Sequence, residues 1–150
     1  MQEYYKNRYG ILYNADCIEV MKEMDEKSVD VTITSPPYDN LRNYKGYDFD
    51  FENTAKELYR VTKDGGTVVW IVGDATVNGT ETGTSFKQAL YFKECGFNLY
   101  DIMIWDKGCS ASVGSMSRYE QVFEYMFIFT KGKIKTANII YDKPNKCVGE

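Results

Sequence analysis

The chain has 150 residues, of which 43% are hydrophobic and 27% are charged, a composition that indicates one globular domain and excludes a disordered chain. The net charge is −4, so the chain has too few cationic side chains to hold duplex DNA by itself, and most of the cationic surface would come from elsewhere. The absence of histidine excludes chemistry that needs a histidine base.

The first half of the chain predicts a strand, a helix and a second strand. Residues 10–14 form the first strand, and Asp16 is then placed as the N-cap of a helix with apolar residues at helical spacing. The β-branched run at 29–34 predicts a buried strand of the parallel type. A polar, Tyr-rich stretch at 39–50 is long for a plain connection, so we expect it to be functional or mobile.

The second half continues the alternation of helices and strands. In chain order we expect a helix at 51–62 ended by Asp64-Gly65-Gly66, a strand at 67–72, a Thr/Gly-rich loop at 75–83, a helix from 86 ended by Gly96, strands at 99–105 and 123–130, and a weak strand at 139–141. The basic run at 131–135 is typical of a solvated turn. The order predicts an α/β domain with a mixed, mainly parallel sheet.

The cysteines and the N-terminus predict a cytoplasmic protein. The four cysteines are widely spaced, with no Cys-x-x-Cys pair and no histidine, so we expect reduced thiols and no metal site. The N-terminus lacks the apolar segment of a secretion signal, and no run reaches membrane-spanning length.

The most informative segment is Thr34-Ser35-Pro36-Pro37-Tyr38, directly after the β-branched strand. The prolines have no N–H, so the carbonyls around them remain free acceptors in a stiff loop. The Ser35 hydroxyl and the Pro36 carbonyl are then suited to accept hydrogen bonds from the exocyclic amine of a base, while Tyr38 stacks on its ring. The alternative is structural, since a Pro-Pro pair commonly ends a strand and the Tyr can cover an edge.

Three segments resemble the amino-methylating DNA methyltransferases. They are residues 14–17, residues 28–38 with the Ser-Pro-Pro-Tyr motif, and residues 58–66, with later similarity at 101–107 and 119–132. The resemblance implies a Rossmann-like, S-adenosylmethionine-dependent fold, here the partial catalytic domain of residues 1–150. It also implies methyl transfer to an exocyclic amine in DNA, with the target base flipped out of the duplex, in the setting of restriction and modification.

The resemblance assigns roles to particular residues. Ser35, Pro36, Pro37 and Tyr38 match the catalytic loop. Asp16, and Thr34 beside the motif, match the cofactor site, although an N-capping role explains Asp16 equally directly.

Three further residues are expected to contact the target base. Asp74, which ends a strand after Gly73, is expected to shape the target pocket, with a simple turn as the alternative. Tyr44 and Tyr47 are expected to close over the extruded base.

The motif favours N4 of cytosine as the methylated atom, because a serine before Pro-Pro in this family goes most often with cytosine. The alternatives are N6-adenine methylation and a non-catalytic α/β module derived from such an enzyme. The reading frame beyond Glu150 is expected to discriminate the enzyme from the module.

The Gly-rich Phe-x-Gly-x-Gly segment that the family uses for the methionine end of the cofactor is not found in this sequence. We therefore expect a truncated or split form that is inactive alone. The edge of the 29–34 strand would then be exposed, and we expect it to be covered by the missing C-terminal half or a second chain, by a homodimer, or by the chain's own N-terminal strand.

Overall fold

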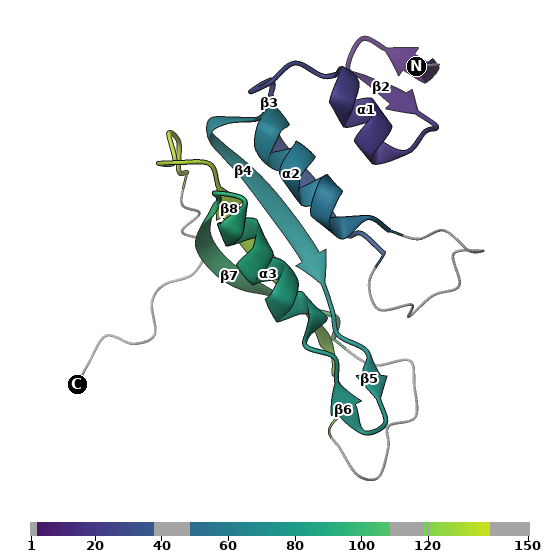
Figure 1. The fold of residues 1–150 in the computed structure, drawn as a ribbon, viewed down its shortest axis with the longest axis vertical. Coiled ribbons are helices and arrows are strands. Elements are labelled where there is room, and N and C mark those ends of the chain that lie inside the picture. Colours follow the sequence, from purple (N-terminus) through teal and green to yellow (C-terminus); the bar gives the residue numbers. More distant parts are fainter. Residues whose placement is uncertain (1–2, 38–48, 109–118, 120, 139–150) are drawn as a thin grey trace.

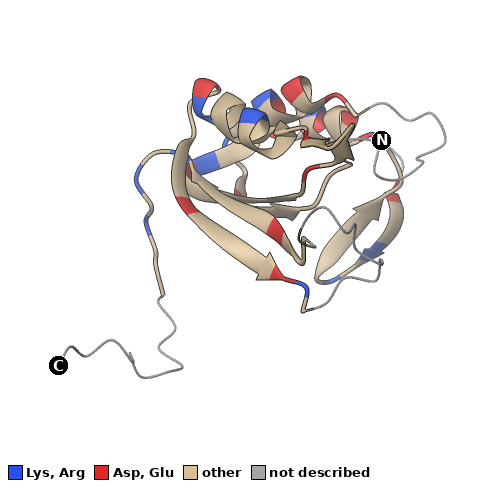
Figure 2. Ribbon diagram, turned by 90° about the horizontal axis from the view of Figure 1, so that it is seen from below, with Lys and Arg blue, Asp and Glu red and all other residues tan. Residues whose placement is uncertain are grey.

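The computed structural model describes residues 3–37, 49–108, 119 and 121–138. Its elements are β1 (Glu3–Asn7), β2 (Gly10–Tyr13), α1 (Cys17–Glu23), β3 (Val29–Thr34), α2 (Phe51–Val61), β4 (Thr62–Val72), β5 (Thr76–Val77), β6 (Thr80–Glu81), α3 (Thr84–Glu94), β7 (Asn98–Asp106) and β8 (Phe123–Thr130). The three helices lie on one face of the main sheet (Figures 1 and 2). No described helix is long and apolar enough to cross a membrane.

The main sheet has four strands in the order β3-β4-β8-β7. β3 pairs with β4 in parallel, whereas β8 is antiparallel to both of its neighbours. Strands β3, β4 and β7 consequently run in one direction, which confirms the mixed α/β sheet. Their carboxyl ends meet at one edge of the sheet, the edge at which ligands bind in open α/β folds.

Aromatic side chains fill the core between the helices and the sheet. Trp70, Phe92, Phe127 and Phe129 are each at most 1% exposed. The rings of Phe92 and Phe129 stack with centroids 4.5 Å apart, and Phe92 meets Trp70 edge-on at 4.9 Å. The indole Nε1 of Trp70 donates to Oε1 of Gln88 at 2.9 Å, so the one polar group of this ring is satisfied in the core.

Helix α2 ends at Val61, one residue before its predicted end, but not through the predicted glycine stop. The chain becomes extended at Thr62 and passes directly into β4, so the predicted stop at residues 64–66 is wrong. The Thr62 hydroxyl donates to the Leu58 carbonyl, satisfying one of the acceptors at the helix end. Gly65, with φ +82°, instead lies in β4, where the pairing register with β3 shifts, as expected for a β-bulge.

Lys131 also departs from its prediction, because it is buried and not part of a solvated turn. Its side chain is 7% exposed, and its Nζ donates to the carbonyls of Tyr59 and Arg60 at the end of α2. The ammonium also lies 4.4 Å from the centroid of the Tyr59 ring. Burial lowers the pKa of Lys131. The residue acts as a cap for α2.

Strand β3 forms where it was predicted, but it is not buried. Val31 is 56% exposed and Ile33 is 70% exposed. Among the described residues β3 pairs only with β4, while the N-terminal strand β2 pairs with β1, a strand that the sequence did not predict. The proposed cover of β3 by the N-terminal strand is therefore wrong for the described part of the chain.

Candidate functional site

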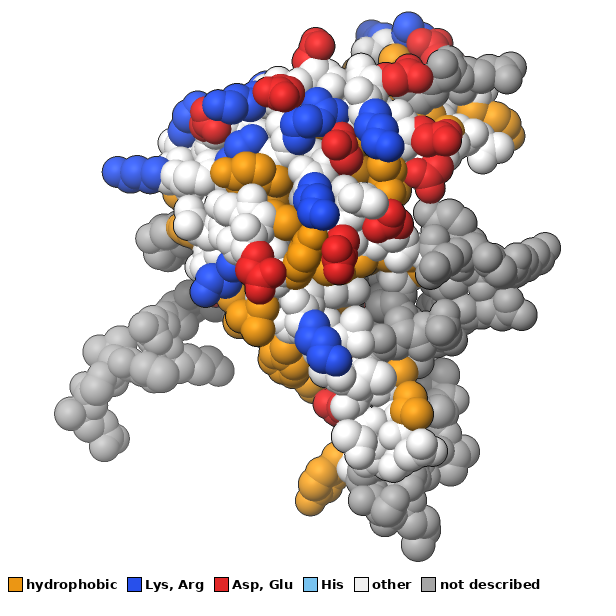
Figure 3. Space-filling model, in the orientation of Figure 1, with side chains coloured by type: hydrophobic (Ala, Val, Ile, Leu, Met, Phe, Trp, Pro, Cys, Tyr) orange, Lys and Arg blue, Asp and Glu red, His pale blue; other side chains and the backbone are white. Residues whose placement is uncertain are grey.

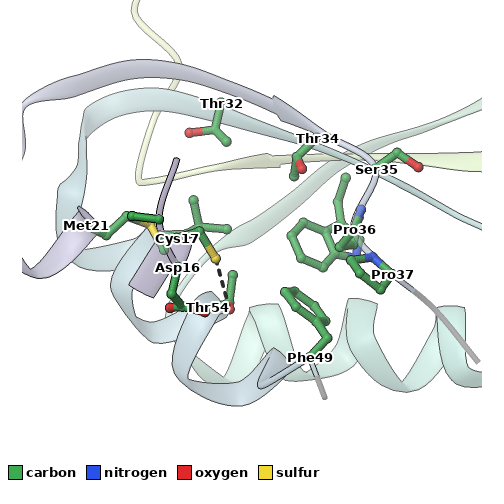
Figure 4. Close-up of a pocket in the computed structure, with 13 residues that line it drawn as sticks. Asp16, Cys17, Met21, Thr32, Thr34, Ser35, Pro36, Pro37, Phe49 and Thr54 are labelled. Atoms are coloured by element: carbon green, nitrogen blue, oxygen red, sulfur yellow. Dashed lines mark hydrogen bonds between the residues drawn. The ribbon is translucent and has the colours of Figure 1, made fainter. Parts of the chain in front are cut away.

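A cavity of about 570 Å³ lies between α1, α2 and the carboxyl end of β3 (Figure 4). The size suits a small organic ligand. Its walls are mainly apolar, with a few hydroxyls and one carboxylate. The residues that line it are Ala15, Asp16, Cys17, Met21, Thr32, Thr34, Ser35, Pro36, Pro37, Phe49, Thr54, Leu58 and Trp70.

The cavity has two distinct ends. Figure 4 shows Asp16, Cys17 and Met21 at one end, and Pro36, Pro37 and Phe49 at the other. The side chains of Thr32 and Thr34 lie between these ends along β3, since alternate residues of a strand face the same side. The structure thus brings Ser35, Pro36 and Pro37 of the motif to one cavity with the predicted cofactor residues Asp16 and Thr34.

The two prolines of the loop are packed against the protein while its serine stays accessible. Pro36 is buried and Pro37 is half-buried, whereas Ser35 is exposed. Figure 4 shows the Ser35 side chain directed away from the Asp16 end of the cavity. Thr34 pairs in register with Trp70 of β4, whose fully buried ring also lines the cavity. The loop therefore starts from a fixed position in the sheet.

Asp16 both caps a helix and lines the cavity. Its Oδ1 accepts hydrogen bonds from the backbone N–H of Ile18 at 2.8 Å and of Glu19 at 3.4 Å, which confirms the predicted N-cap. The cap fixes the carboxylate beside the cavity. The capping role and a ligand-binding role are therefore compatible in this geometry.

Asp74 is not placed at this cavity. The residue is 7% exposed, and it follows β4 at the same edge of the sheet. Its Oδ1 accepts from the backbone N–H of Ser85 at 2.8 Å and from the Thr82 hydroxyl at 3.3 Å, and its Oδ2 accepts from the Ser85 hydroxyl. It thereby supplies the cap that Gly83, the N-cap residue of α3, lacks.

Three predicted residues, Tyr38, Tyr44 and Tyr47, lie outside the described residues. Conversely, the sequence did not point to Phe49 and Trp70 as part of the cavity. Thr32 could have been found, because it lies two residues before Thr34 on the same face of a strand. Within residues 3–37, 49–108, 119 and 121–138, no group of three or more cysteine or acidic side chains could hold a metal ion.

Comparison with known families identifies the chain. The family model for N6/N4 methyltransferases, described as DNA methylase, matches residues 29–147. The chain belongs to this DNA methylase family. The matched segment contains the Ser-Pro-Pro-Tyr motif and the four strands of the main sheet, so the resemblance found in the sequence is confirmed.

Relatives and solved structures agree with this family. The orphan methyltransferase M.BamHII of Bacillus amyloliquefaciens is 63% identical over 127 residues, covering 84% of this chain and 48% of the relative. A Thermus thermophilus protein described as a DNA modification methylase, solved with S-adenosyl-L-methionine, is 25% identical with a TM-score of 0.61, covering 86% of this chain and 56% of that one.

The cytosine-N4-specific PvuII DNA methyltransferase shares the fold. It is 21% identical with a TM-score of 0.65, covering 81% of this chain and 49% of that one. The DNA methylase fold expected from the sequence is thus confirmed. The chain spans about half the length of these three proteins.

The helix-bearing face carries charges of both signs. Figure 3 shows acidic and basic side chains interspersed over this face, with no broad region of one sign. Such a mixture gives little attraction for a polyphosphate backbone. This face of the chain is therefore poorly suited to hold duplex DNA.

Proposed function

We propose that this chain supplies the substrate-binding loop of a DNA methyltransferase that methylates the N4 amine of cytosine. The observation that carries the proposal is the arrangement of Ser35 and Pro36. The exposed hydroxyl and the buried, stiff proline stand at the carboxyl end of β3, next to a cavity suited to a small ligand. Two fixed acceptors at this position suit an exocyclic amine, which has two N–H donors.

The two acceptors would change the reactivity of the amine. In a free base the nitrogen lone pair is delocalised into the ring, so the nitrogen is a poor nucleophile. Hydrogen bonds from the amine to the Ser35 hydroxyl and the Pro36 carbonyl favour a pyramidal nitrogen, whose lone pair is available for attack. Such preorganised polar groups stabilise the charge that develops in the transition state. A methyl group passed from the sulfonium of the donor to this lone pair would leave a neutral thioether and a cationic nitrogen, and loss of one N–H proton to solvent would restore a neutral amine.

The tyrosines would hold the base in this position. The Tyr38 ring follows the two prolines and is proposed to stack on the flipped base. Tyr44 and Tyr47 are proposed to close over it. A Tyr44→Ala variant tests the closing role through the fluorescence of a base analogue at the target position. An unchanged flipping signal would remove Tyr44 from the proposal.

The cofactor that fits this chemistry is S-adenosyl-L-methionine, which supplies the methyl group. Asp16 and Thr34 line the cavity and are the residues proposed to contact it. The remaining walls are largely apolar, so they suit a flat ring better than a charged amino-acid end. The chain contains no Phe-x-Gly-x-Gly segment for that end. The residues present therefore fit only part of the cofactor.

The role of Asp16 can be separated from its capping role. Asn caps helices about as well as Asp, so Asp16→Asn should leave the stability of α1 unchanged while removing the charge. Asp16→Ala should lose both the N-cap of α1 and the negative charge. If the carboxylate binds the cofactor, both variants will weaken its binding in the assembled enzyme. Equal cofactor affinity for Asp16→Asn and the parent would leave Asp16 with the capping role alone.

We infer that residues 1–150 are inactive by themselves, because they span about half the length of the relatives that they match. Isothermal titration calorimetry should show weak or no binding of S-adenosylmethionine to the isolated chain. A micromolar dissociation constant would contradict this inference. DNA as the substrate makes the cytoplasm the expected place of action, in a restriction and modification setting.

The choice of cytosine rests on the serine of the motif and is tested by mass spectrometry of nucleosides from methylated DNA. We expect N4-methylcytosine as the product. N6-methyladenine alone would contradict the choice of base and leave the amino-methyltransferase reaction standing. The complete absence of methylated nucleosides from an assembled, folded complex would favour the non-catalytic module.

A further inference from the structure

A short hairpin, β5–β6, projects from the same edge of the main sheet as the Pro-Pro loop. Strand β4 runs parallel to β3 and leads into the hairpin after Val72, so the loop and the hairpin both follow the carboxyl ends of strands. Figure 1 shows β5 and β6 beyond the end of the sheet. The sequence predicted only a Thr/Gly-rich loop for this segment. The Pro-Pro loop and the hairpin can therefore face the same bound molecule.

The tip of the hairpin has a defined conformation. β5 and β6 are antiparallel, with Val77 opposite Thr80. Between them, Asn78 has a φ of +50° and Gly79 has a φ of +79°, as in the type I′ turn that two-residue hairpin loops prefer. Asn and Gly are the residues that adopt this backbone most readily. The exposed Asn78 side chain is thus presented at a fixed point of the tip.

The base of the hairpin is anchored by the buried carboxylate of Asp74. The backbone N–H of Thr82 donates to the Ala75 carbonyl at 3.0 Å, which closes the hairpin at its base. Asp74 accepts from the Thr82 hydroxyl at 3.3 Å and from the backbone N–H of Ser85 at 2.8 Å. A two-stranded hairpin is marginally stable alone. The contacts of Asp74 therefore hold the hairpin in place against the start of α3.

The surface of the hairpin is polar and carries little charge. Residues 76–81 are all exposed, and Glu81 is the one charged residue among these six. An element that binds phosphates needs cationic side chains, and this segment has none. Amides and hydroxyls, such as those of Asn78 and Thr80, are instead groups that read base edges, and the major groove of DNA admits a two-stranded ribbon. The hairpin therefore fits base recognition better than contact with the phosphate backbone.

We propose that the β5–β6 hairpin reads a base pair near the target base, with Asn78 as the specificity-determining residue. The Asn78 amide has a donor and an acceptor, which match N7 and the N6 amine of an adenine in the major groove. Trp70 pairs with Thr34 beside the motif, and Asn78 follows Trp70 by eight residues. Eight residues span at most about 27 Å, or roughly eight base-pair rises, which bounds the distance of this pair from the target. The inference rests on the proposed function, which places the target base at the motif.

Selection from a random duplex library tests base reading without any need for catalysis. A full-length methyltransferase that contains this chain selects duplexes, which are sequenced for the parent and for two variants. Asn78→Gly removes the amide and keeps a residue that accepts positive φ. Its preference at one base pair should fall about 10- to 100-fold, as expected for the loss of one bidentate contact, with the other positions unchanged. Asn78→Asp keeps the shape but replaces the donor by an acceptor, so this preference should move from adenine to cytosine.

Glu94→Gln is the matched control. Glu94 is exposed at the end of α3 that lies away from the hairpin, so this variant should select the same sequences as the parent. Circular dichroism and thermal unfolding check that the variants fold. An unchanged sequence profile for Asn78→Gly would overturn the proposal, as would a parent that selects no sequence. A uniform loss of affinity without a change in base preference would also overturn it, because the hairpin would then contact the phosphate backbone. Selective binding by a parent that transfers no methyl group would contradict the proposed function and leave base reading intact.

Discussion

Replacing Asp74 by alanine should destabilise the chain strongly, because this carboxylate anchors the start of α3. Asp74 accepts hydrogen bonds from the backbone N–H and the hydroxyl of Ser85 and from the hydroxyl of Thr82. Ser85 is fully buried, so water cannot replace the lost acceptor. Since Gly83 makes no side-chain cap, no other side chain in the described N-terminal turn compensates.

The magnitude follows from two contributions. Loss of an N-cap costs about 0.5–2 kcal/mol, and a buried hydroxyl left without a partner costs about 1–3 kcal/mol. We therefore expect Asp74→Ala to lower the free energy of unfolding by roughly 2–4 kcal/mol. For a chain of this size the melting temperature should fall by about 2–4 °C per kcal/mol.

The assay is urea unfolding followed by circular dichroism, with two further variants as controls. Asp74→Asn keeps an acceptor for the Ser85 N–H and should lose less stability than Asp74→Ala. Ser85→Ala combined with Asp74→Ala should cost less than the sum of the single changes, because the two side chains share one hydrogen bond. A change of less than about 0.5 kcal/mol in Asp74→Ala, the range of ordinary surface substitutions, would refute the anchoring role.

Two further predictions concern helix ends. Hydrogen bonds from the side chain and backbone of Asn53 hold the pKa of Asp50 below its ordinary value of 3.8. The stability that Asp50 contributes is thus present above about pH 4 and is lost as pH falls through its folded pKa. In thermal unfolding from pH 2 to 7, the melting temperatures of the parent and Asp50→Ala should converge at low pH. A difference in melting temperature that stays constant over this range would contradict the prediction. Gly96 has a φ of +109°, so backbone strain alone in Gly96→Ala should lower the free energy of unfolding in urea by about 1–3 kcal/mol. The added Cβ would also lie 2.8 Å from the Tyr59 ring. Gly79→Ala is the control, because Gly79 also has a positive φ but a Cβ there would have no neighbour within 4 Å. An equal loss of unfolding free energy in both variants would exclude the clash with Tyr59.

Local signals in the sequence predicted the local parts of the site. An acidic residue before a helical pattern placed the Asp16 cap, and a β-branched run followed by two prolines placed the end of β3 beside the motif. These features depend on residues within one turn or one strand of each other, where backbone preferences and short hydrogen bonds decide the conformation.

Long-range contacts could not be predicted in the same way. Trp70 reaches the cavity only because β4 pairs with β3 in the register that sets it beside Thr34. Lys131 caps α2 by donating to the carbonyl of Tyr59, which lies 72 residues earlier in the chain. The sequence placed Asp74 at a strand end, where it was expected to shape the target pocket, but gave no sign that its carboxylate would accept hydrogen bonds from Ser85, 11 residues later. Each of these outcomes depends on strand pairing or on packing between distant segments.

The exposure of β3 was mispredicted for a related reason. A β-branched run indicates a strand that can be buried on both faces, but burial depends on which segments are present to cover it. The described residues provide a neighbour on one side only.

The transfer of a labelled methyl group to DNA tests the central claim most directly. A full-length methyltransferase that contains this chain is incubated with labelled S-adenosylmethionine and DNA, in parent form and as Ser35→Ala. Ser28→Ala is the matched control, because this serine precedes the opposite end of β3, where its hydroxyl donates to the Asp25 carbonyl. We predict label in DNA for the parent and the control, and a loss of about 10²-fold or more for Ser35→Ala. Equal labelling by Ser35→Ala, or no labelling by a folded parent enzyme, would contradict the account.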